Sequence, residues 1–323
     1  MRSTPLPAPD LERLYGDIEL FGVPGQVLHL LEESGRLGEV PGPFADWLRA
    51  RRERMAFQNL VLRHKSNEVL ALLDTAGIAT IPLKGVWFAE RFFGHVAGRG
   101  TSDIDLLVHP ERLGAATALL ERSGYAHRKD EHNHTVLEQV RHGLGINVEL
   151  HWKLDKARGS AQRDAPLWAA ARRLPGYTAI YELDELHVLY AIVLHGLRHR
   201  LDSIKYVLDI AQVIRRLGAR VDYAALLELA AAEGTLRRVK IALSVVYTAL
   251  PGLNADAPLP FEPLQTPWSC SAIRAMQRGE TTAESLRWRL FCKLAIYDSM
   301  KHRVQAQRPH HRPVARPPGS RRI

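Results

Sequence analysis

Two aspartates one residue apart run directly into an apolar segment, and this feature constrains the chain more than any other. Residues 101–108 read Thr-Ser-Asp-Ile-Asp-Leu-Leu-Val, and the apolar end has strand character. Successive side chains of a strand point to opposite faces, so Asp103 and Asp105 share one face and Ile104, Leu106 and Val108 share the other. Like charges this close repel each other, which is costly unless a cation lies between them. The pair therefore predicts a metal site on a strand.

A second apolar strand is predicted upstream, over residues 78–83, and it breaks at Lys84-Gly85 into a helical pattern over residues 86–93. The first backbone N–H groups of a helix lack partners within the helix, so such a junction is suited to bind phosphate. A phosphate site beside paired aspartates indicates metal-assisted chemistry on a nucleoside triphosphate.

A third carboxylate is displayed on a predicted hairpin. Residues 135–141 and 146–152 alternate in the manner of strands and are joined by His-Gly-Leu-Gly. In the second strand Asn147, Glu149 and His151 share one face. Glu149 lies beside the two aspartates if this hairpin pairs with their strand.

We predict that Asp103, Asp105 and Glu149 form a metal-binding triad with catalytic function. Magnesium prefers oxygen ligands and leaves positions for water or substrate phosphates. Asp105 is the expected bridge between two ions that would clamp the attacking and leaving oxygens. The alternative is a set of solvated carboxylates at a sheet edge.

The order and spacing of these motifs resemble the nucleotidyltransferase family within the DNA polymerase beta-like superfamily, over roughly residues 60–215, about half the chain. The resemblance is carried by Leu83-Lys84-Gly85, by Arg99-x-x-Ser102-Asp103-Ile104-Asp105-Leu106-Leu107-Val108, and by Val148-Glu149-Leu150-His151-Trp152. The superfamily more often carries Gly-Ser where this chain has Lys84-Gly85.

This resemblance implies an α+β fold, with a small mixed β-sheet flanked by helices and a helical C-terminal domain. It implies transfer of a nucleoside monophosphate from an NTP to a hydroxyl acceptor, with Mg²⁺ or Mn²⁺ as cofactor and release of pyrophosphate. Ser102 then belongs to the nucleotide-binding residues, together with Lys84 and Gly85. The acceptor is left open between a tRNA, a protein, a peptide and a small molecule.

Two cations are expected at the strand ends. Lys84 and Arg99 would form charge-assisted bonds to phosphate, which are stronger than neutral ones, and would stabilise charge on leaving pyrophosphate. The alternative for each is a surface salt bridge.

Lys205 and Asp209 lie one helical turn apart in the predicted helix over residues 204–217 and are expected to pair on one face. The resemblance to nucleotidyltransferases implies that Lys205 contacts the base or a phosphate while Asp209 orients it. An ordinary surface ion pair is the alternative.

Histidines 195 and 199 are four residues apart, but no H-E-x-x-H motif accompanies them, so interior or capping roles are favoured over a zinc site. His151 is interpreted as a half-buried strand residue, with support of the metal site or the acceptor as the alternative.

Composition places the chain among soluble proteins. Its 323 residues allow two compact units. The two cysteines form no disulfide framework or zinc motif, which fits a reducing compartment. The first residues lack the apolar run of a signal peptide, and no stretch approaches the ~20 apolar residues that cross a bilayer. We expect a cytoplasmic protein without membrane contact.

The net charge of +9 comes mostly from the C-terminal segment. Residues 301–323 hold seven Lys and Arg and no acidic residue, which leaves 37 basic against 35 acidic residues, or about +2, in the rest. Four prolines in this segment predict disorder. The tail is a candidate contact for nucleic acid or an acidic partner, and the alternative is a solvated charged tail.

The expected domains are an N-terminal helical segment over residues 1–55, a catalytic core over 56–158, a helical domain over 159–302 and the tail over 303–323. Two other functions are weighed. A non-catalytic descendant would bind nucleotide or RNA without turnover, and a metal-dependent phosphodiesterase or nuclease would use the same carboxylates without an NTP. The three carboxylates disfavour the first, and the Lys84-Gly85 turn disfavours the second.

Overall fold

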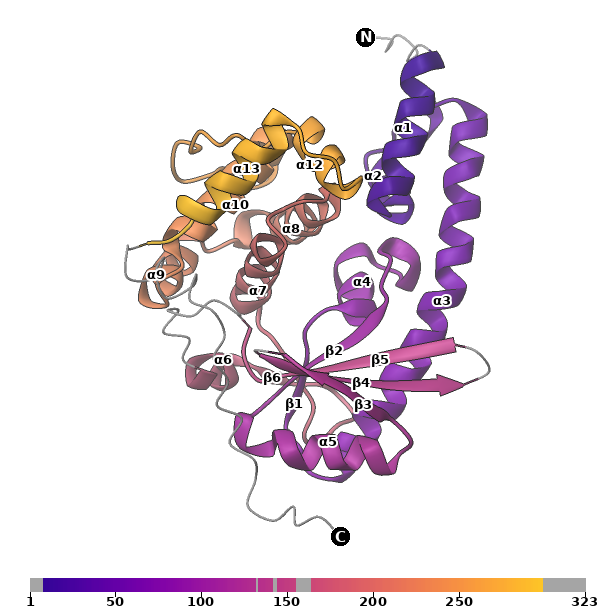
Figure 1. Cartoon of the computed structure of the whole chain (residues 1–323), viewed down its shortest axis with the longest axis vertical. Coiled ribbons are helices and arrows are strands. Elements are labelled where there is room, and N and C mark those ends of the chain that lie inside the picture. Colours follow the sequence, from indigo (N-terminus) through magenta and orange to yellow (C-terminus); the bar gives the residue numbers. More distant parts are fainter. Residues whose placement is uncertain (1–7, 132, 142–143, 155–163, 299–323) are drawn as a thin grey trace.

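The computed structural model describes residues 8–131, 133–141, 144–154 and 164–298. A twisted sheet lies in the lower half of the view in Figure 1, and most of the C-terminal helices lie above one of its faces. The arrangement confirms the predicted α+β class with a mixed sheet.

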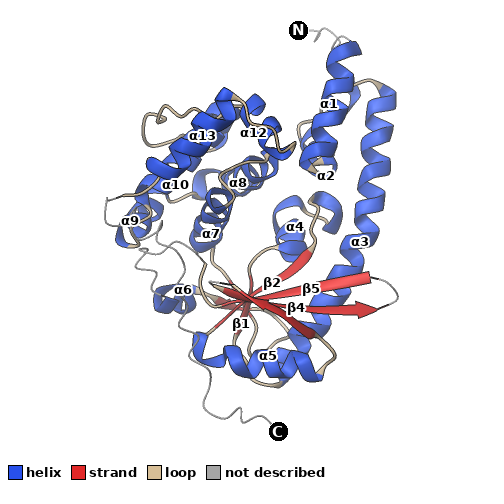
Figure 2. Ribbon diagram, in the orientation of Figure 1, coloured by secondary structure: helices blue, strands red, loops and turns tan. Residues whose placement is uncertain are grey.

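The sheet has five strands in the order β1-β2-β5-β4-β3 (Figure 2). Only β2 and β5 are parallel, and the other neighbouring pairs are antiparallel. The strands are β1 (Thr80–Pro82), β2 (Asp103–Val108), β3 (Ala126–Asp130), β4 (His134–Arg141) and β5 (Leu144–His151).

The pairing of β2 with β5 is the register that matters for the site. Asp105 lies opposite Glu149, and Asp103 lies opposite Asn147. On the other side of β5, His134 of β4 lies opposite His151. The predicted hairpin and its pairing with the aspartate strand are therefore confirmed, and polar side chains from three strands share one face.

The opposite face of the sheet is apolar and fully buried. Ile104, Leu106 and Val108 of β2 join Val148 and Leu150 of β5 in one core with side chains of α3 (Gly42–Thr75) and α5 (Leu113–Arg122). The polar face is therefore turned toward the C-terminal helices. It also carries Leu107, which packs in one core with side chains of those helices.

The N-terminal region is helical, as the pattern predicts. Helices α1 (Ala8–Phe21) and α2 (Pro24–Glu33) pack with the start of α3, with Leu208 and with Ile273. Helix α3 runs without interruption across the expected boundary between residues 55 and 56. The division of the chain into domains stays a prediction.

The remaining helices cover the sheet and form the C-terminal part. Short 3₁₀ turns span Leu37–Glu39, Val96–Gly98, Pro110–Arg112 and Gly218–Arg220. The helices are α4 (Gly85–Phe93), α6 (Asp164–Ala170), α7 (Glu185–Arg198), α8 (Ile204–Leu217), α9 (Tyr223–Ala232), α10 (Leu236–Ala249), α11 (Leu253–Asp256), α12 (Cys270–Gln277) and α13 (Ala283–Leu294).

Several elements were not predicted. Strand β3 is exposed along its length and reads Ala-His-Arg-Lys-Asp, without the apolar alternation that marks a half-buried strand. Charged side chains are common on edge strands, because they discourage pairing with other chains. The two-residue strands β6 (Arg172–Arg173) and β7 (Tyr181–Glu182), and helix α12, were also missed.

Helix α13 ends at Leu294. The chain turns to place the Asp298 carboxylate at the first turn of α10, where it accepts hydrogen bonds from the backbone N–H groups of Leu236 (2.9 Å) and Arg237 (2.7 Å). A carboxylate at a helix N-terminus accepts from backbone N–H groups that have no partner within the helix, and its negative charge interacts favourably with the helix dipole. The predicted disordered tail lies outside the described residues.

No helix among the described residues is both long and apolar enough to span a bilayer.

Leu150 tests the importance of the apolar sheet face. Leu150→Ala should lower the free energy of unfolding by about 2–5 kcal/mol, because it opens a cavity beneath the central strand. Val140 of β4 is 58% exposed and is the matched control, so Val140→Ala should change stability by less than about 0.5 kcal/mol. Urea unfolding measures both, and similar losses would contradict this assignment of the core.

Candidate active site

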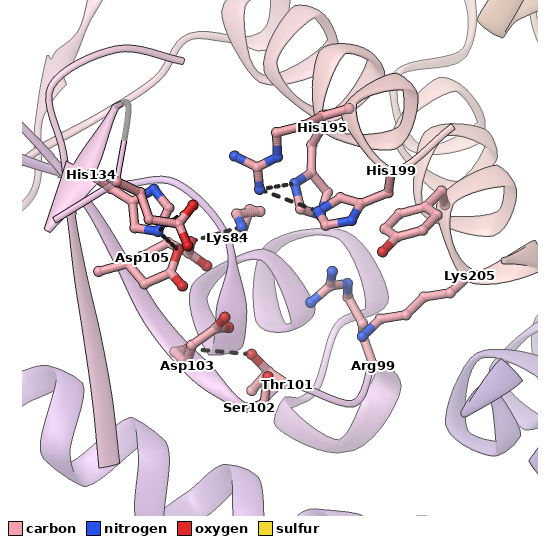
Figure 3. A pocket seen from close by; sticks show the side chains of 14 residues that line it. Lys84, Arg99, Thr101, Ser102, Asp103, Asp105, His134, His195, His199 and Lys205 are labelled. Carbon is pink, nitrogen blue, oxygen red and sulfur yellow. Dashed lines mark hydrogen bonds and ion pairs between the residues drawn. The ribbon is translucent and has the colours of Figure 1, made fainter. Parts of the chain in front are cut away.

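A pocket of about 570 Å³ opens between the polar face of the sheet and helices α7 and α8 (Figure 3). Its walls differ in charge. The sheet side carries the carboxylates of Asp103, Asp105, Glu131 and Glu149, and the other side is rich in cationic and imidazole groups. The basic lining residues are Lys84, Arg99, Arg198 and Lys205. The imidazoles opposite the sheet are those of His195 and His199, whereas His134 belongs to β4 on the sheet side.

The structure brings the predicted metal triad together. One oxygen each from Asp103, Asp105 and Glu149 lies within 4.8 Å of the others. The cause is local: Asp103 and Asp105 are two residues apart on β2, and the parallel register places Glu149 next to Asp105. This spacing is suited to a divalent cation with oxygen ligands.

Asp105 is the most constrained of the three carboxylates. Its Oδ1 accepts from Lys84 Nζ at 2.7 Å and from His151 Nε2 at 2.9 Å. Its Oδ2 is buried and has no hydrogen-bond partner among the described residues. Burial alone would raise the pKa of Asp105, but the Lys84 charge and the His151 hydrogen bond outweigh it and hold the pKa well below its usual range. Asp105 thus contributes to the triad an ionised carboxylate with one oxygen that no described residue hydrogen-bonds.

The neighbouring carboxylates respond differently. Burial, and then the charge of Asp105, raise the pKa of Asp103. Burial also acts to raise the pKa of Glu149, but a hydrogen bond from His151 and the nearby charge of His134 leave it lowered. Nearby cations and hydrogen-bond donors therefore leave the pKa of Asp105 and Glu149 lowered, whereas the charges of Lys84 and Arg99 do not offset the effects that raise the pKa of Asp103.

The Lys84-Gly85 turn depends on glycine. Gly85 has a φ of +72°, and a Cβ added there would lie 3.2 Å from the carbonyl oxygen of Asp103. The turn starts α4 as predicted and directs the Lys84 side chain to Asp105. Lys84 thus holds the Asp105 carboxylate, and the contact of Lys84 with phosphate stays a prediction.

Arg99 forms a buried ion pair with Asp209, the residue that was predicted to pair with Lys205. Its Nε lies 2.9 Å from both oxygens of Asp209, and Gln26 Nε2 donates to Asp209 Oδ1 at 2.8 Å. All three side chains are buried. Gln26 belongs to α2, so the N-terminal helices help to position an arginine at the pocket.

The predicted pair between Lys205 and Asp209 is wrong. Asp209 turns to Arg99 and Gln26, and the described residues show no ion pair between Lys205 and a carboxylate within 4.0 Å. Burial lowers the pKa of Lys205 to about 8, and the charge of Arg99 adds to this effect. Tertiary packing overrode the i,i+4 pairing because the buried guanidinium of Arg99 takes the Asp209 carboxylate as its counterion.

Histidines 195 and 199 hold an arginine rather than a metal. Arg198 donates to His195 Nδ1 at 3.1 Å and to His199 Nε2 at 3.4 Å. Burial, and then the charge of Lys84, lower the pKa of His195 well below its usual value, which keeps it a neutral acceptor. No cluster of three metal-ligating side chains in the described part of the chain includes either histidine, in line with the favoured non-zinc role.

His151 is fully buried and bonded to Asp105, so its interpretation as a half-buried strand residue is wrong. His134, Asn133, Arg198 and Gln26 were missed altogether. His134 carries a signal in the sequence, since a hairpin register that extends by one residue places it opposite His151. Nothing in the local pattern marks Gln26, which lies 183 residues from its partner.

A small mixed sheet presents two aspartates and a third carboxylate to a pocket lined with cations, which is the arrangement that the resemblance to nucleotidyltransferases implies. Residues 8–250 match the family described as uncharacterised nucleotidyltransferase. Since the match spans more than half of the chain, the protein belongs to this family, and the expected class of enzyme is confirmed.

Other comparisons are weaker. No protein of curated function matches the chain in sequence. The solution structure of the antibiotic-resistance factor ANT(2'')-Ia is 16% identical over 62% of this chain and 97% of its own, with a TM-score of 0.37. The crystal structure of ANT(2'')-Ia with adenylyl-2''-tobramycin is 15% identical over 60% of this chain and 98% of its own, also with a TM-score of 0.37. Likenesses at this level do not identify a substrate.

Removal of the Asp209 carboxylate tests the Arg99 clamp. Asp209→Ala leaves a buried guanidinium without its counterion and should lower the free energy of unfolding by about 3–5 kcal/mol. Asp46→Ala is the matched control, because the Asp46–Arg49 pair (2.7 Å) is exposed and should contribute at most about 1 kcal/mol. Urea unfolding compares the two variants. Equal losses in the free energy of unfolding would show that Asp209 is not needed to neutralise a buried Arg99.

Proposed function

We propose that this protein transfers a nucleoside monophosphate from an NTP to an acceptor hydroxyl, with a divalent cation held by Asp103, Asp105 and Glu149. Nucleotide transfer is the activity of the family to which the chain belongs. One observation carries the finer proposal: a buried, ionised and unpartnered Asp105 oxygen lies within a cluster of three carboxylates that faces a cationic wall.

The residues fit Mg²⁺ or Mn²⁺. Three carboxylates supply oxygen ligands of the kind that these ions prefer, and the raised pKa of Asp103 marks a site where a cation would relieve repulsion. Asp105 would be the bridging ligand if two ions bind. When bound, such ions neutralise phosphate charge and join the NTP phosphates to the carboxylates.

The opposite wall supports a triphosphate site. Lys205 and Arg198 both line the pocket, and neither forms an ion pair with a carboxylate within 4.0 Å in the described residues. Arg99 offers less free charge, because Asp209 takes up part of it. Charge-assisted bonds from these side chains would hold the phosphates and stabilise the leaving pyrophosphate. Gly85 and Ser102 are proposed to approach the nucleotide as well.

The acceptor is proposed to enter on the Glu149 side. Its hydroxyl oxygen attacks the α-phosphorus, the bond to the pyrophosphate oxygen breaks, and Glu149 takes up the hydroxyl proton. Most of the acceleration would come from positioning and charge neutralisation. The acceptor stays open between a tRNA, a protein, a peptide and a small molecule, and a cytoplasmic location stays a prediction.

Substitution of the central carboxylate tests the chemistry. Asp105→Asn should reduce Mg²⁺-dependent pyrophosphate release by about a thousandfold or more, since loss of a metal ligand removes several kcal/mol of transition-state stabilisation. Release from each NTP is measured in host lysate, with α-labelled NTP used to identify the labelled acceptor.

Two further variants make this test specific. Asp103→Asn should abolish turnover without loss of fold, because it removes a repelling charge, and the exposed Asp46→Asn should leave turnover unchanged. Unimpaired turnover by both active-site variants would exclude the mechanism. Nucleotide binding without turnover by the native protein would favour the non-catalytic alternative.

The pKa of Lys205 predicts how anion binding depends on pH. Its folded-state pKa of about 8 lies below the ordinary 10.5, so the folded protein carries this charge below about pH 8 and loses it as the pH rises further. Affinity for inorganic tripolyphosphate with Mg²⁺ should therefore fall by roughly 10–100-fold across this range, the strength of one charged hydrogen bond.

Calorimetric titration at several pH values measures the affinity. Lys205→Arg should retain strong binding without this pH dependence, and Lys205→Met should bind weakly at every pH. A native affinity that does not change through pH 8 would contradict a phosphate-binding role for Lys205.

A further inference from the structure

Three aromatic rings meet in the helical wall of the pocket, across from the carboxylates. Tyr206 of α8 carries the only six-membered aromatic ring among the described residues that line the pocket, and the imidazoles of His195 and His199 line it as well. The Tyr206 and His199 rings are stacked, with centroids 5.1 Å apart and planes at 9°. His195 meets the Tyr206 ring edge-on, with centroids 5.4 Å apart and planes at 72°. The three rings therefore form one aromatic group at the pocket.

The His-Gly-Leu-Arg-His segment at the end of α7 builds this group. His195 and His199 are four residues apart, so both rings lie on the same side of the last helical turn. Gly196 allows α8 to approach this turn closely, because a Cβ added there would lie 3.3 Å from Tyr206 Cβ and 2.8 Å from Leu201 Cδ2. The glycine between the histidines thus makes room for the tyrosine.

The aromatic group is an uncharged surface in a pocket that is otherwise polar. Burial, and then the charge of Asp202, raise the pKa of Tyr206 to about 12, so the phenol is neutral near pH 7. His195 is neutral too, because burial lowers its pKa well below its usual value. Apart from the imidazoles, every other described residue of the lining is charged or carries a hydroxyl group. A flat, neutral π system is the kind of ligand group that such a surface accepts.

The aromatic group is next to the cations that are proposed to bind phosphate. Lys205 directly precedes Tyr206 in the first turn of α8, and Arg198 directly precedes His199. Figure 3 shows His195, His199 and Lys205 on the side of the pocket away from Asp103 and Asp105. A nucleotide carries its phosphates at one end and a flat aromatic base at the other, so the neighbouring cationic and aromatic groups match the two ends of one ligand.

We infer that the Tyr206 ring, with His199 stacked on it, is the surface that binds the base of the nucleotide. Every base has a π face, and stacking on an aromatic side chain stabilises a bound nucleotide without particular hydrogen-bond groups. The base is favoured over the acceptor as the occupant, because the acceptor is proposed to enter on the Glu149 side. The identity of the ligand as an NTP rests on the proposed function, but base binding requires no transfer step.

Calorimetric titration at pH 7 with Mg²⁺ tests this inference without turnover. The probes are α,β-methylene analogues of the four NTPs, which cannot be cleaved at the α-phosphorus, and inorganic tripolyphosphate, which has no base. Tyr206→Leu keeps an apolar side chain against α7 but removes the ring. It should weaken binding of the tightest analogue by about 5–100-fold, the contribution of one stacked base. Its affinity for tripolyphosphate should change by less than about threefold.

Three other variants make the test specific. Tyr206→Phe retains the ring and should bind the analogue within about threefold of the native affinity. Phe57→Ala removes a ring of α3 that is 70% exposed and does not line the pocket, so it should leave both affinities unchanged. Tyr206→Ala should reproduce the selective loss, and it replaces Tyr206→Leu if thermal unfolding shows that the leucine variant is not folded.

Four results would overturn the inference. Equal losses of analogue and tripolyphosphate affinity in Tyr206→Leu would assign Tyr206 to the phosphate side or to packing alone. Unchanged affinity for both probes would exclude the aromatic surface, and so would a native protein that binds tripolyphosphate but none of the analogues. Loss of the fold in both Tyr206→Leu and Tyr206→Ala would make Tyr206 a packing residue.

Failure of the proposed function gives a different result. A native protein that binds an analogue through Tyr206 but releases no pyrophosphate would refute nucleotide transfer and retain the base site. Pyrophosphate release with the same KM for NTP in the native protein and in Tyr206→Leu would retain the transfer and refute the base site.

Discussion

Repulsion among carboxylates on one sheet face is the constraint around which this site is built. The parallel pairing of β2 with β5 places Glu149 beside Asp105, two residues from Asp103. Such a cluster persists only if cations or donors offset the charge. Lys84 and His151 do so for Asp105, and their two bonds fall on the same oxygen. No described residue hydrogen-bonds the other oxygen of Asp105, and the proposed metal site rests on this asymmetry.

Charge on the facing wall is divided between fixed and available cations. Arg99 is neutralised by Asp209, which Gln26 of the N-terminal helices also holds. Arg198 donates to two imidazoles, which carry no negative charge, and Lys205 forms no ion pair with a carboxylate within the described part of the chain. Helices from both ends of the chain therefore contribute to one electrostatic arrangement. Removal of water from this wall would strengthen its attraction for phosphate, because the effective dielectric constant falls with burial.

Much of the fold and the triad could be predicted because those features are local. Alternation in residues 103–108 and 146–151 marks the strands, and the turn at Lys84-Gly85 marks the start of α4. Strand β3 was missed because an exposed charged edge has no apolar pattern. The Lys205–Asp209 pair failed because helical spacing describes only one of the neighbours that compete for a carboxylate. His134 and His151 both lie within hydrogen-bond distance of the Asn133 amide, which no pattern in the sequence singles out.

By itself the sequence determined the α+β class, the two strands that carry carboxylates and the family of enzymes, since periodicity and motif spacing are properties of the chain. Tertiary structure alone decided which cation serves which carboxylate. Burial sets the cost of leaving a charge unpaired, and only packing determines which groups are buried together. For that reason Asp209 forms its ion pair with Arg99 rather than with Lys205. For the same reason His134 is hydrogen-bonded to Asn133, a residue that neither its type nor its spacing had marked.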